Sequence, residues 1–467
     1  MIVVKNNLNL NKKPLKYIND TIVAQITPVS RGGVGIIRVS GCKVKTVSNK
    51  ILKKIPKPRY ADYIPFFDDN DIVIDHGIAI YFPSPNSFTG EDVLELHGHG
   101  GLIVLNLILK RILDINEVRI ANPGEFCERA FLNKKIDLIQ AEAISDLIEA
   151  NSEQAVRSAI KSLQGVFSSN IYKLVNMLKE LRIYIEGSID FSEQENTYLL
   201  NNEIKYKLNK IILFLKNILS QTKKGILLRE GINIVIAGSP NAGKSSLLNT
   251  LVGSDVAIVT DIAGTTRDIL CEHIYINGIQ INIFDSAGLC NPNNEVERIG
   301  VERALNIIKR ADRILYVVDS TVTSKNEFQF CSEFIDCLSY KIPITIIRNK
   351  IDLTGEDVKI ENKEYPTIYM SVRECNGINI LYEHLKSIVS FNNDNEGVFI
   401  ARERHLQALK SAYIYLSNCY EEIITNNSYE LIAEELRLAQ NELNKITGKY
   451  TSDDLLHSIF SNFCIGK

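Results

Sequence analysis

Short apolar runs separated by glycine and polar turns characterise the first third of the chain. TIVAQIT begins at Thr21 and leads through a glycine-rich turn into RGGVGIIRVSG, and the runs DIVIDHGIAIYFP and EDVLELHGHGG follow. Short runs rich in β-branched residues predict strands, and the first two predict a hairpin. We therefore expect a β-rich, mixed α+β domain over residues 21–134, preceded by an N-terminal extension of residues 1–20.

A helical period replaces this pattern at Lys135. Apolar residues then recur three and four positions apart, from Ile136 to Ile148 and again from Leu163 to Leu181. This spacing places them on one face of a helix, so long amphipathic helices are predicted over residues 135–230.

Strands alternating with helices follow from Gly231. The apolar runs INIVIAG, INIFD, RILYVVDS and ITIIRNK predict a parallel sheet with helices on both faces over residues 231–391. The helical period returns over residues 392–467, in HLQALKSAYIYL and ELIAEELRLAQNEL. The simplest arrangement is an α/β domain inserted into a helical domain, whose two parts pack together. A separate C-terminal helical domain is the alternative.

Composition narrows the class of protein. The 467 residues are 45% hydrophobic and carry a net charge of −3, which excludes a wholly disordered chain and argues against holding nucleic acid by bulk charge. Nine cysteines without a CxxC pair argue against disulfide frameworks and zinc ribbons. No apolar run approaches the ~18 residues that span a bilayer. A cytoplasmic protein without a membrane segment is expected.

A phosphate-binding motif opens the predicted α/β domain. GSPNAGKS, from Gly238 to Ser245, matches G-x-x-x-x-G-K-[ST], follows a predicted strand and precedes a predicted helix from Lys244 to Leu251. Its glycines let backbone N–H groups surround phosphates, Lys244 supplies a positive charge to the β and γ oxygens, and the Ser245 hydroxyl is a Mg²⁺ ligand.

Two further motifs follow later strands. DSAG places Asp285 at a strand end, where it can hold the metal through water, and Gly288 near the γ-phosphate. In NKID, the Asp352 carboxylate can accept from both N1–H and the 2-amino group of guanine, which favours GTP over ATP. SVR, from Ser371 to Arg373, is the remaining base-side loop.

The loop TDIAGTTRD, from Thr260 to Asp268, occupies the position of a switch loop, and Thr266 is its predicted Mg²⁺ ligand. Leu289 follows DSAG, and an aliphatic side chain cannot orient water. The nearby acids Glu295, Glu297 and Glu302 are candidates for this task. From the residues alone, they are equally well interpreted as solvated carboxylates at a helix start.

Six segments of the sequence are together specific enough to indicate one protein family. They are GSPNAGKSSLLN, TDIAGTTRD, DSAG with EVERIGVERA, PNSFTGEDVLELHGHGG, NPGEFCERAFLNKKIDLIQAEAI and the ending FCIGK. From about Thr21 to Lys467 the sequence resembles the MnmE (TrmE) family of tRNA-modification GTPases. The resemblance implies a folate-binding N-terminal domain that dimerises, a discontinuous helical domain and a GTPase domain inserted into it.

The resemblance also implies functional residues. Asn241 matches a potassium ligand, and Thr260, Ile262 and Thr265 match the loop whose backbone oxygens complete that K⁺ site. Glu297 matches the water-orienting acid. With these additions, the catalytic residues are Glu297, Lys244 and Thr266. The predicted nucleotide contacts are Asn241, Ala242, Gly243, Lys244, Ser245, Ser246, Thr260, Asp261, Ile262, Ala263, Gly264, Thr265, Thr266, Asp285, Ser286, Ala287, Gly288, Asn349, Lys350, Asp352, Ser371, Val372 and Arg373.

The folate site implied by the resemblance consists of Arg38, Glu95, Lys135 and the terminal Lys467. A pterin presents a 2-amino-4-oxo edge like that of guanine, so Glu95 could bind it as Asp352 binds guanine. Cys464 lies in the FCIGK ending. It is either a reactive group near the one-carbon unit or a small apolar residue in a terminal turn.

The function implied is GTP hydrolysis coupled to tRNA modification. A homodimer would act with a flavoprotein resembling MnmG (GidA), which carries FAD. Together they would build a carboxymethylaminomethyl or aminomethyl group at C5 of the wobble uridine (U34), with a 5,10-methylene or 5-formyl tetrahydrofolate as the folate cofactor. The alternative is an RNA- or ribosome-assembly switch GTPase without modification activity, which has no reason to carry Arg38, Glu95, Lys135 and the FCIGK ending.

Overall fold

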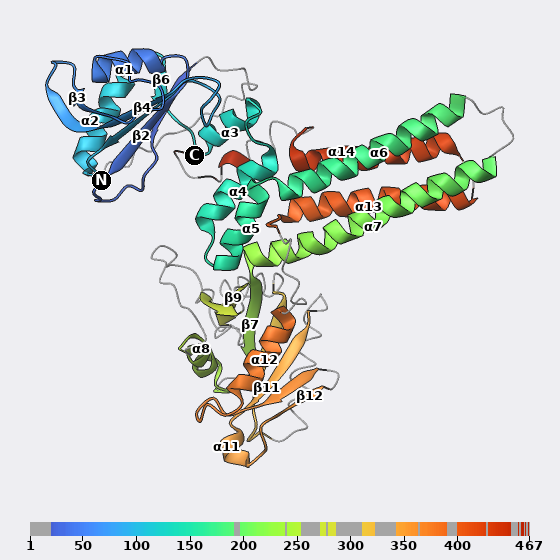
Figure 1. Cartoon of the computed structure of the whole chain (residues 1–467). Coiled ribbons are helices and arrows are strands. Elements are labelled where there is room, and N and C mark those ends of the chain that lie inside the picture. Colours follow the sequence, from blue (N-terminus) through green and yellow to red (C-terminus); the bar gives the residue numbers. More distant parts are fainter. Residues whose placement is uncertain are drawn as a thin grey trace, which may run out of the picture. The chain divides into compact units, whose positions relative to one another are not determined.

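The computed structural model describes residues 20–190, 197–238, 241–253, 271–276, 279–285, 311–322, 342–362, 365–389, 399–425, 428–449, 456, 459–461, 463 and 466. The described chain divides into two compact units (Figure 1). One comprises Met1–Ser145, Ser162–Ile212 and Ala408–Lys467, and the other comprises Asp146–Lys161 and Leu213–Gln407. The five-part division predicted from the sequence stays a prediction.

The N-terminal part is a six-stranded sheet with the strand order β3-β4-β5-β2-β1-β6 (Figure 1). Its strands are β1 (Thr21–Gln25), β2 (Gly35–Ser40), β3 (Asp62–Phe67), β4 (Val73–Phe82), β5 (Val93–Gly98) and β6 (Val118–Ile120). The predicted hairpin is confirmed, because β1 and β2 pair antiparallel. The helices are α1 (Val44–Leu52), α2 (Leu102–Leu113) and α3 (Glu125–Leu132).

The two faces of this sheet differ in chemistry. Val23, Ile37 and Leu94 point to the face that α1 and α2 cover, and all three are buried in one apolar cluster with side chains of those helices. Because strand side chains alternate, Arg38 and Ser40 belong to the other face. Phe126 of α3 packs there against apolar side chains of β1.

The predicted helical period is confirmed. It forms α4 (Leu138–Glu149), α5 (Glu153–Leu163), α6 (Val166–Asp190), α7 (Thr197–Glu230), α13 (Glu403–Thr425) and α14 (Tyr429–Thr447). Arg182 of α6 donates to Gln440 of α14 over 3.0 Å, so parts far apart in sequence pack together. Near the C-terminus, Phe460 and Phe463 pack with Cys127 and Leu138. No described helix combines the length and apolar character needed to cross a membrane.

A seven-stranded sheet forms the core of the inserted α/β part, in the order β12-β13-β11-β10-β7-β9-β8. Its strands are β7 (Ile232–Gly238), β8 (Cys271–Ile276), β9 (Ile279–Asp285), β10 (Arg313–Asp319), β11 (Ile344–Asn349), β12 (Lys359–Asn362) and β13 (Pro366–Tyr369). The described helices are α8 (Lys244–Val252), α11 (Ile351–Thr354) and α12 (Ile378–Val389).

The five central strands pair in parallel, as the sequence predicts, but both edge strands run antiparallel. Two residues separate β8 from β9 and three separate β12 from β13, whereas a parallel pair needs a crossover of about a dozen residues or more. Helices α8 and α12 pack on one face, where Leu247 and Leu381 are fully buried. The fold is therefore multidomain. Along the chain, a mixed α+β part comes first and is followed by a helical part, into which an α/β part is inserted.

Candidate functional site

The described part of the phosphate loop begins at the carboxyl end of β7 and ends at the first turn of α8. Three residues have left-handed backbone angles: Gly238 at φ +143°, Asn241 at φ +62° and Gly243 at φ +100°. A Cβ on Gly243 would lie 2.3 Å from Asn349 Nδ2, and one on Gly238 would lie 2.1 Å from Val317 O. The motif therefore needs glycine at both positions, for space as well as for backbone conformation.

Lys244, the first residue of α8, folds back over this loop. Its Nζ donates to the Gly238 carbonyl oxygen over 3.1 Å, so the positive charge lies across the loop. Ser245 and Ser246 follow in the first turn of α8, where both are exposed. A helix N-terminus with an adjacent ammonium group favours an anion, and Ser245 belongs to the same first turn.

Asn349 connects the phosphate loop to the base-side loop. This side chain is buried; its Nδ2 donates to Ala242 O over 2.8 Å, and its Oδ1 accepts from Val372 N over 3.0 Å. The sequence predicts Asn349 as a nucleotide contact. The structure shows in addition that Asn349 holds two loops together. One amide thus fixes the spacing between the phosphate and base sides of the site.

The base-side residues predicted from NKID and SVR lie together. Ser371 Oγ donates to Asp352 Oδ1 over 2.6 Å, which orients the carboxylate. Lys350, at φ +67°, donates from Nζ to Asp319 Oδ2 over 2.6 Å. Burial would raise the pKa of Asp319, but the hydrogen bonds from Lys350 and Thr321 and the charge of Lys350 together outweigh burial and hold the pKa below its usual range. Arg373 is exposed in the turn after Val372.

Asp319 is a residue that the motifs miss. It ends β10, as Asp285 ends β9, and parallel strands in one sheet bring such ends to the same edge. A polar residue closing an apolar strand is the only signal for it in the sequence.

Several predicted residues lie outside the described part, and their roles stay predictions. Asp285 is described only as the last residue of β9, paired with Ile236 of β7. The residues not described are Thr260, Asp261, Ile262, Ala263, Gly264, Thr265, Thr266, Ser286, Ala287, Gly288, Glu295, Glu297, Glu302, Cys464 and Lys467.

A second polar site lies on the N-terminal sheet. Arg38 of β2 and Glu95 of β5 are directly opposite in the strand register, and Arg38 Nε donates to Glu95 Oε1 over 2.9 Å. The Arg38 guanidinium carbon lies 5.4 Å from the ring centre of Phe88 and 5.7 Å from that of Phe126. The sequence predicts Arg38 and Glu95 as site residues, and the structure brings them into contact.

Electrostatics keep Glu95 ionised. Burial alone would raise its pKa, but the hydrogen bond with His97 and the charge of Arg38 outweigh burial, so the pKa lies below its usual range. His97 Nε2 is 3.3 Å from Glu95 Oε2. The carboxylate therefore presents acceptor oxygens in a charged, half-buried setting.

The other predicted members of this site are placed in part. Lys135 Nζ donates to Pro85 O over 3.0 Å, in the same loop that carries Phe88. Gly466, next to the terminal Lys467, lies at the end of β1: a Cβ on it would be 2.9 Å from Gln25 O. The chain's end therefore returns to the N-terminal sheet.

Comparison with known proteins agrees with this arrangement. The family model described as "MnmE helical domain" matches residues 138–464, and the one described as "GTP-binding protein TrmE N-terminus" matches residues 21–135. The chain belongs to the MnmE (TrmE) family. Two relatives, each called tRNA modification GTPase MnmE, come from Proteus mirabilis and Yersinia pseudotuberculosis. They are 58% and 56% identical, over 97% and 96% of this chain and 100% and 99% of their own.

Among solved structures, Era of Aquifex aeolicus bound to GDP and aluminium fluoride is 21% identical, over 46% of this chain and 89% of its own, with a TM-score of 0.27. The G domain of FeoB from T. maritima is 22% identical, over 34% of this chain and 99% of its own, with a TM-score of 0.26. TM-scores this low leave the fold of this MnmE-family chain to be argued from its own strand order.

Proposed function

We propose that this chain is the GTP-hydrolysing component of a cytoplasmic complex that modifies C5 of the wobble uridine (U34) in tRNA. The relatives that match nearly the whole chain carry the name tRNA modification GTPase. The observation that carries the proposal is the Asn349 bridge from Ala242 to Val372, because it joins a phosphate loop to a guanine-reading carboxylate in one site.

The residues present fit GTP and Mg²⁺. The Gly243 position leaves no room for a side chain, so the backbone can approach phosphates, and Lys244 supplies the charge. Asp352, oriented by Ser371, would accept from the two guanine donors. Ser245 and Thr266 would hold Mg²⁺, which neutralises charge on the phosphates.

Hydrolysis would need one more positive charge and an oriented water. Asn241, with Thr260, Ile262 and Thr265, would hold K⁺, which supplies the charge that an arginine finger gives in other GTPases. Glu297 would orient the attacking water through a bridging water, a task that Leu289 cannot perform. Asn241 has a left-handed backbone conformation and is exposed, which supports the potassium part of the proposal.

The N-terminal site fits a reduced folate. Glu95 would accept from the amino-pyrimidinone edge of the pterin, and Arg38, Lys135 and Lys467 would supply positive charge around it. The approach of Gly466 to Gln25 supports a contribution from the chain's end. A 5,10-methylene or 5-formyl folate would supply the one-carbon unit. FAD would be held by a flavoprotein partner resembling MnmG.

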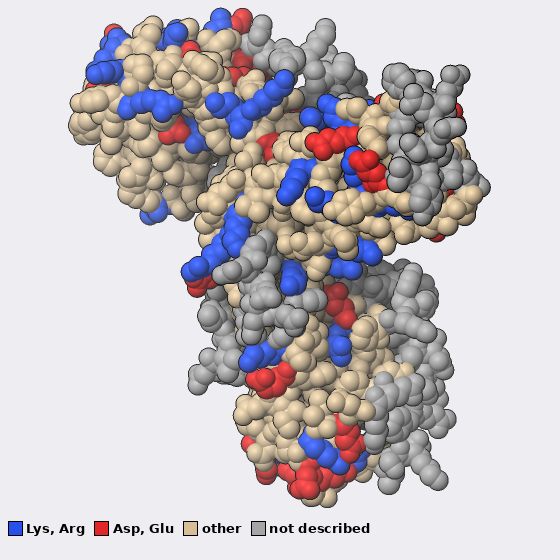
Figure 2. Space-filling view, turned by 45° about the vertical axis from the view of Figure 1, so that its right-hand side comes forward, with Lys and Arg blue, Asp and Glu red and all other residues tan. Residues whose placement is uncertain are grey.

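The remaining parts of the proposal are assembly and tRNA contact. We propose a homodimer. On α2, Ile103 is 76% exposed and Leu107 is 50% exposed, which supports apolar contact with a second copy. Lys and Arg side chains are scattered over the visible face of the described residues, interspersed with acids (Figure 2). Because the chain has a net charge of −3, we propose that tRNA is held by a local basic patch or largely by the partner.

The proposal is tested by reconstitution with the flavoprotein, tRNA, reduced folate, GTP and either K⁺ or Na⁺ at equal ionic strength. GTP turnover and the mass of the U34 nucleoside are both measured, for the wild type and for Asn241→Ala. We expect K⁺-dependent turnover and a modified nucleoside, with the K⁺ preference lost in the variant. Turnover without any modified nucleoside would favour the RNA-assembly alternative. Equal turnover in both salts would contradict the potassium site.

A further inference from the structure

The loop Pro83–Asp92, which joins β4 to β5, carries the aromatic ring nearest to the Arg38 guanidinium. Phe88 lies on this loop with its ring centre 5.4 Å from Arg38 Cζ, and the side chain is 37% exposed. An exposed aromatic ring beside a charged pair offers a flat heterocycle a stacking surface next to hydrogen-bonding groups. The position of this loop therefore decides the shape of the site around Arg38 and Glu95.

Bonds within the loop fix its shape but not its place on the sheet. Ser84 N donates to Asp92 Oδ1 over 2.9 Å, and Ser84 Oγ donates to Gly90 O over 2.8 Å. Both bonds join the two ends of the loop to each other. What holds the loop against β2 and α3 must lie elsewhere.

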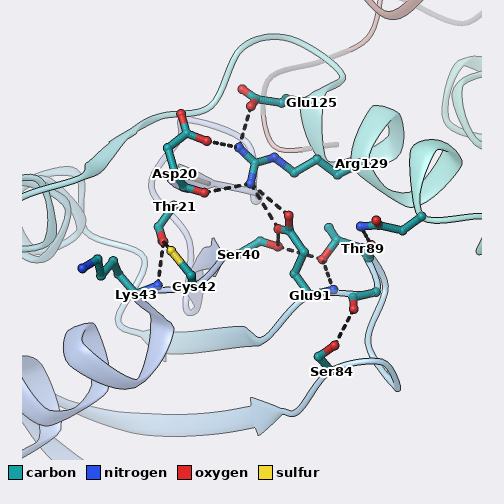
Figure 3. Close-up of polar contacts among 12 residues, drawn as sticks. Asp20, Thr21, Ser40, Cys42, Lys43, Ser84, Thr89, Glu91, Glu125 and Arg129 are labelled. Atoms are coloured by element: carbon teal, nitrogen blue, oxygen red, sulfur yellow. Dashed lines mark hydrogen bonds and ion pairs between the residues drawn. The ribbon is translucent and has the colours of Figure 1, made fainter. Parts of the chain in front are cut away.

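Arg129 of α3 connects the loop to a cluster of buried and partly buried charges (Figure 3). Its Nη2 is 2.7 Å from Asp20 Oδ1 and 2.9 Å from Glu125 Oε1, and its Nη1 is 3.1 Å from Glu91 Oε2. The Arg129 side chain is 8% exposed, so these bonds form where water screens little. Glu91 is the member of this cluster that belongs to the loop.

Glu91 also contacts β2, through Ser40. Ser40 Oγ donates to Glu91 Oε2 over 2.7 Å and lies 2.7 Å from Thr89 Oγ1 (Figure 3). Ser40 is two positions beyond Arg38 and so shares its face of the sheet. A continuous set of polar contacts therefore runs from Arg129 through Glu91 and Ser40 to the strand that carries Arg38.

Arg119 shows which part of the cluster is specific to the loop. Its Nε donates to Asp20 Oδ2 over 2.6 Å, and its Nη1 donates to Glu125 Oε2 over 2.7 Å. Asp20 and Glu125 therefore have a second guanidinium partner, whereas the bond to Glu91 comes from Arg129. The contact with Glu91 of the loop therefore distinguishes Arg129 from Arg119.

We propose that Arg129 is a positioning residue for the folate site: by holding Glu91, it fixes the loop on which Phe88 forms the wall that stacks against the pterin ring. This inference rests on the proposed folate function and assigns roles to three residues outside the predicted site, namely Arg129, Glu91 and Phe88. Arg129 does not touch the ligand; it acts through Glu91 and the loop.

The test uses the absence of tryptophan from the sequence. Phe88→Trp places the chain's single tryptophan on the loop, so that its fluorescence can be excited selectively over that of the 19 tyrosines. Arg129→Gln and Arg119→Gln are each combined with it, and acrylamide quenching is measured without ligand. We expect quenching to increase in Arg129→Gln and to change little in Arg119→Gln. Circular dichroism follows folding, and Glu91→Gln addresses the same link from the loop side should Arg129→Gln fail to fold.

Folate binding is measured separately, by calorimetry with 5-formyltetrahydrofolate in the chain that retains Phe88. We expect Arg129→Gln to raise Kd about tenfold, equivalent to ~1.4 kcal/mol, with Arg119→Gln close to wild type. Phe88→Ala should weaken binding as well. Equal quenching and equal Kd in the two arginine variants would overturn the role of Arg129. No binding to the unsubstituted chain would overturn the proposed folate function, whatever the quenching shows.

Discussion

At the residue scale, Asp352 is the side chain that should select the base. Its carboxylate is held by Ser371 and matches two donors of guanine. In Asp352→Asn, the amide donates where the carboxylate accepted, so the variant should lose GTP affinity by about 10- to 100-fold and gain affinity for xanthosine triphosphate, whose C2 oxygen accepts. Competition between the two nucleotides for a fluorescent analogue measures this. A parallel loss of both affinities would indicate damage to the loop instead.

Residues of the two proposed sites differ in how readily the sequence alone identifies them. Lys244 and Asp352 belong to short motifs with fixed spacing, because the phosphate loop and the NKID turn are local structures. Asp319 belongs to no such motif, and Arg129 lies within NPGEFCERAFLNKKIDLIQAEAI without a role that the sequence indicates. Lys350 is 31 positions from Asp319, and Asp20 is 109 positions from Arg129. Their pairing depends on strand order and on the packing of α3, which no local pattern encodes.

At the scale of elements, alanine substitutions at two helical glycines should have opposite effects on stability. In α7, a Cβ on Gly225 would lie 2.1 Å from Phe399 O, whereas a Cβ on Gly187 in α6 has no neighbour within 4 Å. Gly225→Ala should therefore destabilise the chain by about 1–3 kcal/mol through overpacking. Gly187→Ala should stabilise it by roughly 0.5–1 kcal/mol, the usual gain in a helix. Urea unfolding followed by circular dichroism compares them; stabilisation by both would contradict the close contact at Gly225.

Helices with a strong hydrophobic period can be predicted from the sequence, whereas the edge strand β12 cannot. The buried positions of α6 and α14 recur every three or four residues, so their helices are visible in the sequence. β12 is the four-residue run KIEN, in which Lys359, Ile360 and Asn362 are exposed, and no apolar pattern marks it. Its place comes from pairing with β13, so tertiary contact outweighs local preference.

At the scale of the whole molecule, Asp146 joins three distant segments within one compact unit. Arg229, at the end of α7, and Arg402, just before α13, both donate to Asp146 Oδ1, over 2.8 and 2.9 Å. Asp146→Ala should cost about 1–3 kcal/mol of unfolding free energy, because it removes a buried carboxylate from two partly buried guanidinium groups. Glu230→Ala, which removes an exposed partner of Arg229, should cost at most about 1 kcal/mol. Equal losses in urea unfolding would refute the central place of Asp146.

The close approach of Gly225 to Phe399 has a consequence for how such a chain could arise. The two chain segments that lead into and out of the β7–α12 region lie against each other, at Gly225 and Phe399. A helical protein without this region would need only a short turn here. A domain whose two ends lie close together can be inserted at such a turn without lengthening or redirecting the helices on either side. A nucleotide-driven module can in this way be gained, exchanged or lost in evolution as a single unit.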